Sequence, residues 1–127
     1  MNIAKDISTL LQSITNNICI DEMQDDGTDN CITVYHSGGN KPQYFFGGTK
    51  QIENPSIQVR VRHQNRKDAL NWCYKVKNIL DGKSNFTINN NNYILVTLSS
   101  DILNLGRDNQ GRVHYSLNFN IQVTRNN

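Results

Sequence analysis

The clearest pattern in the chain is an alternating segment that passes directly into a helical one. Residues 57–62 alternate strictly between apolar and polar side chains, which predicts a strand with one buried face. The apolar face comprises Ile57, Val59 and Val61, and the polar face comprises Gln58, Arg60 and Arg62. A helix follows, with Asn65 as the expected N-cap and Gly82 supplying a left-handed turn at its end. Its apolar stripe comprises Ala69, Leu70, Trp72, Cys73, Val76, Ile79 and Leu80.

A second amphipathic helix is predicted at the N-terminus, from about residue 2 to residue 15. Its apolar residues recur at helical spacing, and Asn2 is the expected N-cap. The apolar face comprises Ile3, Ile7, Leu10, Leu11 and Ile14. The opposite, polar face comprises Lys5, Asp6, Ser8, Thr9 and Gln12.

The C-terminal third of the chain predicts three strands. Residues 85–88 and 93–99 form a hairpin around the asparagine run 89–92. Residues 113–124 then alternate without interruption, which predicts one buried and one polar face. The expected buried residues are Val113, Tyr115, Leu117, Phe119, Ile121 and Val123; the polar face includes Asn118 and Asn120.

Long polar connections are predicted between these elements. Residues 21–30 are acidic, residues 31–36 form a short β-branched strand, and residues 37–55 and 100–112 are expected to be loops. The first of these loops contains Tyr44, Phe45 and Phe46, which we expect to dock either on the protein's own core or on a neighbour.

The predicted fold class is α+β, in a single domain over residues 1–127. The element order is α-β-β-α-β-β-β, with a mostly antiparallel five-stranded sheet and both helices packed on one face.

Composition narrows the class of protein. The hydrophobic fraction is 36%, the mean hydropathy is -0.61, and no apolar run approaches the roughly 20 residues of a membrane span. No secretory signal is visible, so we expect synthesis in a cytoplasm, and the three cysteines have no pairing pattern. No membrane partner is expected.

The chain shows no pattern for catalysis, a metal or a cofactor. Its histidines, His36, His63 and His114, are far apart and are expected at the surface. A calcium loop centred on Gly27 would place Thr33 where the bidentate glutamate belongs. We therefore expect no enzyme and no cofactor, although catalytic groups can converge in space without a sequence signature.

The basic residues are scattered, and the net charge is only +2. The densest cluster, residues 60–67, contains Arg60, Arg62, Arg66 and Lys67. One interpretation is a small nucleic-acid-binding domain, and the other is an ordinary solvated surface.

Three segments together resemble the tail terminator, or tail completion, proteins of long-tailed bacteriophages. They are the N-terminal helix, the segment from P-S-I-Q-V-R-V-R to I-L-D-G (55–82), and L-G-R-D-N-Q-G-R-V-H-Y-S-L-N-F-N-I (105–121). The resemblance implies a structural virion protein, assembled in the host cytoplasm. It would form a hexameric ring that caps the tail tube, stops its polymerisation and joins the tail to the head.

The implied partners are further copies of the chain, the tail tube protein and the head-side connector, with DNA only passing through the lumen. Subunit or tube contacts are expected from the polar strand faces and the long connections. The candidate residues are Gln58, Arg60, Arg62, Tyr44, Phe45, Phe46, Arg107, Arg112, Asn118 and Asn120. Another neck component or a tail tube protein is the alternative within this class.

Overall fold

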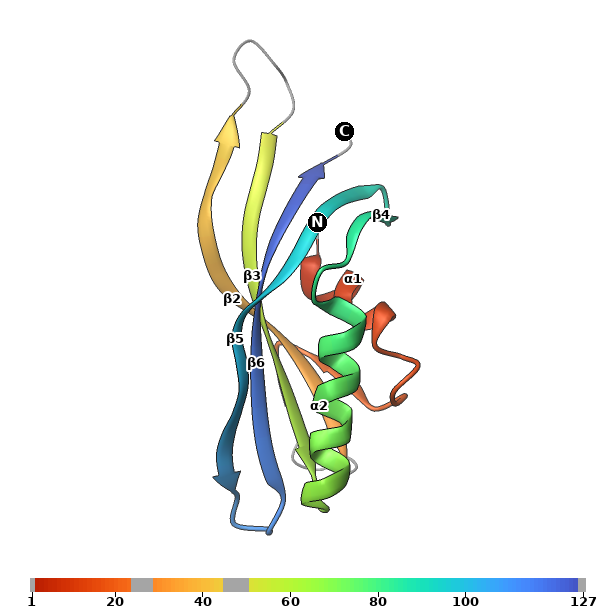
Figure 1. The fold of residues 1–127 in the computed structure, drawn as a ribbon, viewed down its shortest axis with the longest axis vertical. Helices are drawn as coiled ribbons and strands as arrows, with labels where there is room; N and C mark the ends of the chain where they lie inside the picture. Colours follow the sequence, from red (N-terminus) through yellow and green to blue (C-terminus); the bar gives the residue numbers. More distant parts are fainter. Residues whose placement is uncertain (1, 24–28, 45–50, 126–127) are drawn as a thin grey trace.

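The computed structural model describes residues 2–23, 29–44 and 51–125, which build two helices and one sheet of six strands (Figure 1). In chain order the elements are α1 (Ile3–Leu10), β1 (Ile18–Ile20), β2 (Cys31–Tyr44), β3 (Gln51–His63), α2 (Arg66–Leu80), β4 (Ser84–Ile88), β5 (Asn91–Arg107) and β6 (Val113–Arg125).

The prediction of an α+β fold with a mostly antiparallel sheet of five strands is wrong. The described strands run in the order β1-β2-β3-β6-β5-β4, and β1 pairs with β2 in parallel while the other pairs are antiparallel. Strand β1 escaped prediction because its three residues are too few to show a period. The fold is mostly β, since β2 and β5 are far longer than predicted.

Two predicted loops are strands in the structure. Residues 37–44 and 51–55 continue β2 and β3, and residues 100–107 continue β5. Their alternation is broken by register shifts, which place extra residues on one strand and move side chains between faces. Only residues 108–112 remain a turn between β5 and β6.

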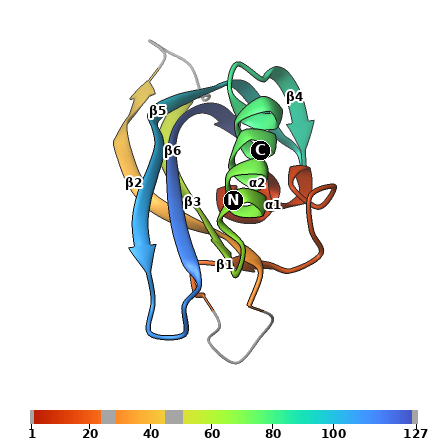
Figure 2. The same ribbon diagram turned by 60° about the horizontal axis from the view of Figure 1, so that its bottom comes forward.

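One apolar core joins the sheet to both helices. The strand residues expected to be buried, Ile57, Val59, Val61 and the six of β6, are all buried and lie in register on one face. Ile3 and Ile7 of α1 and its C-cap Leu11 belong to the same cluster, and the apolar stripe of α2 lies in it or packs against it. The sheet is strongly twisted, and β4 curls back beside the helices (Figure 2).

The helix caps are as predicted. Asn2 accepts a hydrogen bond from the backbone of Lys5, and Asn65 accepts from Lys67 and Asp68. Gly82 has φ +80 after α2. Helix α1 nevertheless ends at Leu10, several residues before the predicted end.

Asp6 corrects the prediction for the polar face of α1. Its carboxylate is 2% exposed and accepts hydrogen bonds from Asn89 Nδ2 at 2.8 Å, Asn91 Nδ2 at 2.9 Å and Tyr93 Oη at 2.5 Å. These donors lie at the β4–β5 turn, where Asn89 and Asn90 adopt positive φ. The asparagine run therefore both makes the turn and binds α1 to it.

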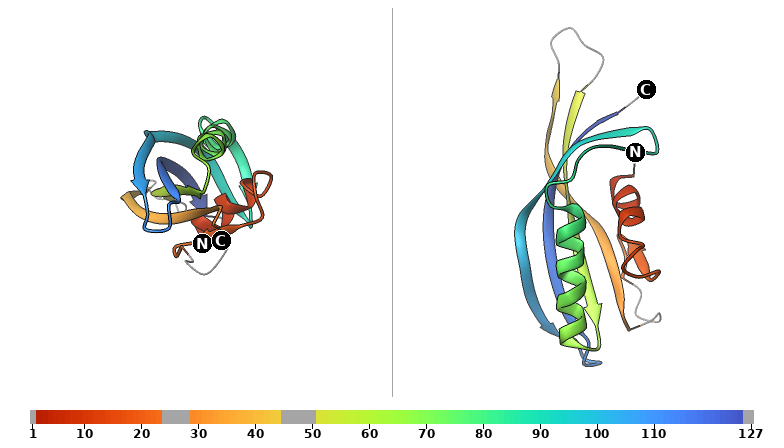
Figure 3. Two further views of the ribbon diagram at one scale, coloured as in Figure 1. Left: turned by 90° about the horizontal axis from the view of Figure 1, so that it is seen from below. Right: turned by 45° about the vertical axis from the view of Figure 1, so that its right-hand side comes forward.

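The β2–β3 hairpin extends past both helices (Figure 3). We call its outer part, residues 39–44 and 51–55, the arm. At the base of the arm Gly39 has φ +128, and a Cβ there would lie 2.2 Å from the carbonyl oxygen of Asn54. Glycine is thus required where the arm bends between two register shifts. Of the arm residues whose side chains the structure describes, 39–40 and 52–55, none belongs to the core cluster.

Candidate functional site

The face of the sheet turned away from the helices is polar along its central strands. We call it the helix-free face; its residues on β3 and β6 are Ser56, Gln58, Arg60, Ser116, Asn118 and Asn120. Cross-strand neighbours are hydrogen bonded to each other: Ser56 Oγ donates to Asn120 Oδ1 at 2.8 Å, and Gln58 Nε2 donates to Asn118 Oδ1 at 3.3 Å. The bonds fix the side chains in a ladder, which leaves a rigid surface with little rotamer entropy to lose on binding.

Arg60 lies next to this ladder and is half-buried. Its guanidinium carbon is 5.8 Å from the ring centroid of Tyr35, within the range of a cation–π contact. Burial raises the pKa of the Tyr35 hydroxyl, so this ring is neutral at physiological pH. The contact places the guanidinium of Arg60 beside the Tyr35 ring and leaves part of the side chain at the surface.

Arg62 and Arg112 were expected at the surface but are buried, with 1% and 4% exposure. Arg62 Nε donates to the backbone oxygen of Asp29 at 3.2 Å, and Arg112 lies 3.5 Å from the Asp29 carboxylate. Gln64 Nε2 also donates to Asp29. These contacts join the start of β2, the end of β3 and the β5–β6 turn, so both arginines hold one end of the sheet together.

Asp108 completes this end of the sheet. It accepts from Arg112 Nε at 2.8 Å and lies 2.9 Å from His114 Nε2, and it also accepts from the backbone of Gln110 and Arg112. The hydrogen bond from His114, together with those from Arg112 and Gln110, lowers the Asp108 pKa well below its usual range. The carboxylate therefore remains ionised and holds the turn closed.

The remaining candidates are more exposed or lie outside the described residues. Arg107 is exposed, and its guanidinium donates to the backbone oxygen of Gly111 at 2.6 Å across the turn. Tyr44 ends β2 and its backbone pairs with Gln51. Phe45 and Phe46 lie outside the described residues.

The basic cluster at 60–67 does not form one surface. Arg60 lies on the helix-free face and Arg62 is buried, whereas Arg66 and Lys67 are exposed in the first turn of α2. A nucleic-acid surface needs several cations on one face, so this arrangement argues against that interpretation.

His63 also departs from the prediction. It is 8% exposed, packs edge-on against Trp72 at 4.8 Å and accepts a hydrogen bond from the backbone of Asn65. Burial lowers its pKa. His114 is half-buried beside Asp108, and His36 is exposed and hydrogen bonded to Asp21.

A cavity of about 230 Å³ lies on the helix-free face beside the arm. Its lining residues are Asn40, Asn54, Leu95, Thr97, Asn120, Ile121 and Gln122. Amides dominate and none of these side chains ionises, so the cavity offers hydrogen bonds of the kind a polypeptide backbone or another amide can use. Within residues 2–23, 29–44 and 51–125, no cluster of three potential metal ligands is present.

Sequence reasoning missed the most exposed large hydrophobic residues of the described chain. Tyr74 on α2 is 55% exposed, Leu103 is 56% exposed and Leu105 is 42% exposed. The two leucines were hidden in a presumed loop, where an L-x-L pair with glycine gives no period. Neither described helix is long and apolar enough to cross a membrane.

Comparison with known proteins assigns the family. The sequence profile of the family described as "Bacteriophage tail terminator protein" matches residues 3–125. The chain belongs to this family. It is accordingly a structural protein of the phage tail and a virion component, as the resemblance of its sequence implied.

A solved structure has the same fold. A chain in "Virion of native gene transfer agent (GTA) particle" superposes with a TM-score of 0.64 over 97% of this chain and 95% of that chain. The two are only 10% identical, so the similarity is one of architecture. No curated protein matched the sequence.

Proposed function

We propose that this chain caps the phage tail tube as a closed ring, ends tube polymerisation and offers the surface to which the head-side connector binds. The observation that carries the proposal is the match to the tail terminator family over residues 3–125, almost the whole chain. The ring is expected to be hexameric, to lie at the head–tail junction and to let DNA pass through its lumen.

The surface chemistry supports a role in protein assembly. A ring closes through heterologous contacts, in which two different surfaces of each subunit meet. The helix-free face, with its hydrogen-bonded ladder, and the projecting arm are two such surfaces. The ladder residues Ser56, Gln58, Asn118 and Asn120 present amides and a hydroxyl rather than ionised groups, which lowers the cost of desolvation when this face meets a partner.

The candidate contact residues divide by position. Gln58, Arg60, Asn118 and Asn120 are proposed to contact a neighbouring subunit or the tube from the helix-free face, and Arg107 is proposed to do so from the end of β5. Tyr44, Phe45 and Phe46 are proposed to contact the same partners; of these, Phe45 and Phe46 lie outside the described residues. Arg62 and Arg112 are proposed to act through the shape of the end they stabilise, because both are buried.

The test is assembly of tail tubes in vitro, viewed by negative-stain electron microscopy. Tube protein polymerises with or without this chain, and tube length and end structure are measured. We expect shorter tubes bearing a ring at one end. The double substitution Asn118→Asp and Asn120→Asp should abolish capping, whereas Asn71→Asp on the exposed side of α2 should not.

The same micrographs distinguish a capping protein from the alternative, another neck component or a tail tube protein. A tube or neck component would polymerise into the tube or bind along its length, and tubes would not be shortened. Either observation would refute capping. A nucleic-acid role would appear as binding to DNA that weakens steeply with salt.

A further inference from the structure

The outer edge of β5 carries no described strand along most of its length. Strand β4 pairs with β5 at residues 91–95, and the backbone of Val96 is bonded to Lys83 and Gly82. Beyond Leu98, which donates to Asp81, β5 continues to Arg107 with β6 on one side and no described strand on the other. Residues 99–107 therefore form an open edge, which we call the β5 edge.

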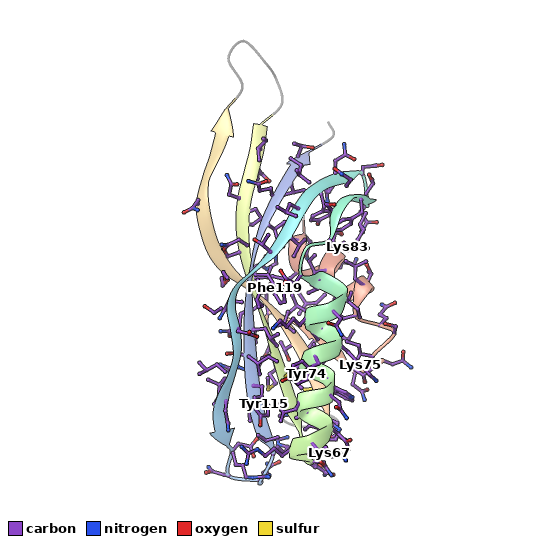
Figure 4. All side chains as sticks on the ribbon, viewed as in Figure 1. Lys67, Tyr74, Lys75, Lys83, Tyr115 and Phe119 are labelled. Carbon is purple, nitrogen blue, oxygen red and sulfur yellow. The ribbon has the colours of Figure 1, made fainter. Side chains whose placement is uncertain are left out.

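Exposed apolar side chains flank this edge. Leu103 and Leu105 lie on it, and Leu103 is in register with Ser116 of the helix-free face. On the other side, Lys77 Nζ bonds Asp101 at 3.0 Å, and Tyr74 is three residues before Lys77, so it lies on the same side of α2. Figure 4 shows Tyr74 on the side of α2 towards β6, opposite Lys75.

The β5 edge is also irregular. Register shifts fall between Ser100 and Leu103 and between Asn104 and Gly106, and two of its amides are bonded to local side chains: Ile102 to Asp101 and Gly106 to Asn104. Bulges of this kind prevent indiscriminate pairing with any flat strand. A partner must match the shape of this edge, which favours a specific contact.

A complementary edge lies at the opposite side of the same sheet. Strand β1 pairs with β2 only at Ile32–Val34, so from Ser37 onward the outer edge of β2 has no described strand beside it. This part of β2 leads into the arm, whose pairing is itself irregular. Pro42, which cannot donate to a ladder, is typical of such an edge. One chain thus carries two different open edges.

We propose that the β5 edge of one subunit binds residues 37–41 of β2 in a second copy of this chain, which continues the sheet from subunit to subunit. Backbone hydrogen bonds supply the contact, and Leu103, Leu105 and Tyr74 bury apolar area around it. Two unlike edges on one chain are what a heterologous, closed ring requires. The inference rests on the proposed ring and names its subunit interface.

The first test compares oligomeric state by analytical ultracentrifugation, with and without tail tubes. Leu103→Asp with Leu105→Asp should weaken self-association at least about a hundredfold, because each change places a carboxylate in the contact. Tyr74→Asp should also weaken it. Ser84→Asp on β4 and Lys75→Asp on the far side of α2 are the matched controls and should leave it intact; circular dichroism confirms that every variant is folded.

The second test locates the partner edge. One preparation carries Leu103→Cys and another carries Ser37→Cys, both with Cys19→Ser, and a short bis-maleimide is added to the mixture. We expect heterodimers joining the two substituted positions, and none when Lys75→Cys replaces Leu103→Cys.

The outcomes separate the two proposals. An oligomer that survives the double leucine substitution, or that gives no cross-link, overturns the edge contact and leaves the capping function standing. A wild-type chain that stays monomeric at high concentration and on tubes overturns both.

Discussion

Replacing Asp6 tests whether the buried carboxylate holds α1 on the sheet. The substitution Asp6→Ala removes the acceptor for Asn89, Asn91 and Tyr93. Asn89 is exposed and can bond to water, but Asn91 and Tyr93 are 8% and 1% exposed and would keep unpaired donors. At about 1–3 kcal/mol for each buried unpaired group, the free energy of unfolding should fall by about 2–6 kcal/mol. That is a large part of the roughly 5–15 kcal/mol typical of a domain.

The measurement is urea unfolding followed through the fluorescence of Trp72, the single tryptophan. The midpoint should fall while the m-value stays unchanged. Tyr93→Phe removes one bond to the same carboxylate and should cost about 1.5–3 kcal/mol, and Lys5→Ala beside it should be nearly neutral.

The double variant, Asp6→Ala with Tyr93→Phe, tests whether the loss of stability comes from the hydrogen bond between these two residues. Because Asp6 and Tyr93 share one hydrogen bond, their effects should not add, and the interaction energy should reach at least about 1 kcal/mol. The reasoning is refuted if Asp6→Ala costs less than about 1 kcal/mol, or if the two effects add.

Three further outcomes are expected. Burial lowers the pKa of His63, so the unfolded chain binds its proton at a higher pH than the folded one; stability should be full above about pH 6.5 and fall below it. Urea midpoints from about pH 8 to 5 check this, and His63→Gln should flatten the slope. Gly39→Ala should destabilise more than Gly38→Ala by at least about 1 kcal/mol in the same assay, because both have positive φ but only Gly39 meets the β3 backbone. Burial raises the pKa of Cys73 to about 12, so in the folded protein iodoacetamide should modify Cys19 first; mass spectrometry that finds Cys73 modified first would contradict this.

The sequence predicted α2 and β6 well because in each the apolar residues recur with a regular period over more than ten residues. Such a repeat puts all of them on one face, which must be the buried one. Their buried residues, both helix caps and the asparagine hairpin are confirmed. The local pattern of apolar and polar residues is enough to predict burial where a side chain only has to pack in the apolar core.

Prediction from the sequence pattern failed where a residue's environment depends on partners distant in the chain or on irregular strand geometry. Asp6 looked solvated on a helical wheel, since its donors come from residues 89–93. Leu103 and Leu105 looked like loop residues because bulges break their alternation. Arg62 and Arg112 looked exposed, and only the three-dimensional meeting of Asp29 with the β5–β6 turn explains their burial.

The contacts of Asp6 also govern when the protein can fold. Its partners follow it by 83, 85 and 87 residues, and the ladder bond from Gln58 to Asn118 spans 60. On a ribosome, α1 emerges first and can contact β1 and β2, but the carboxylate of Asp6 has no donors until the β4–β5 turn has been made. The central pair β3–β6 waits for β6. Such long closures make folding slow, on the order of milliseconds to seconds. Subunits therefore become competent for assembly only after β6 has been made, so that no chain lacking β6 offers a finished edge to a growing ring.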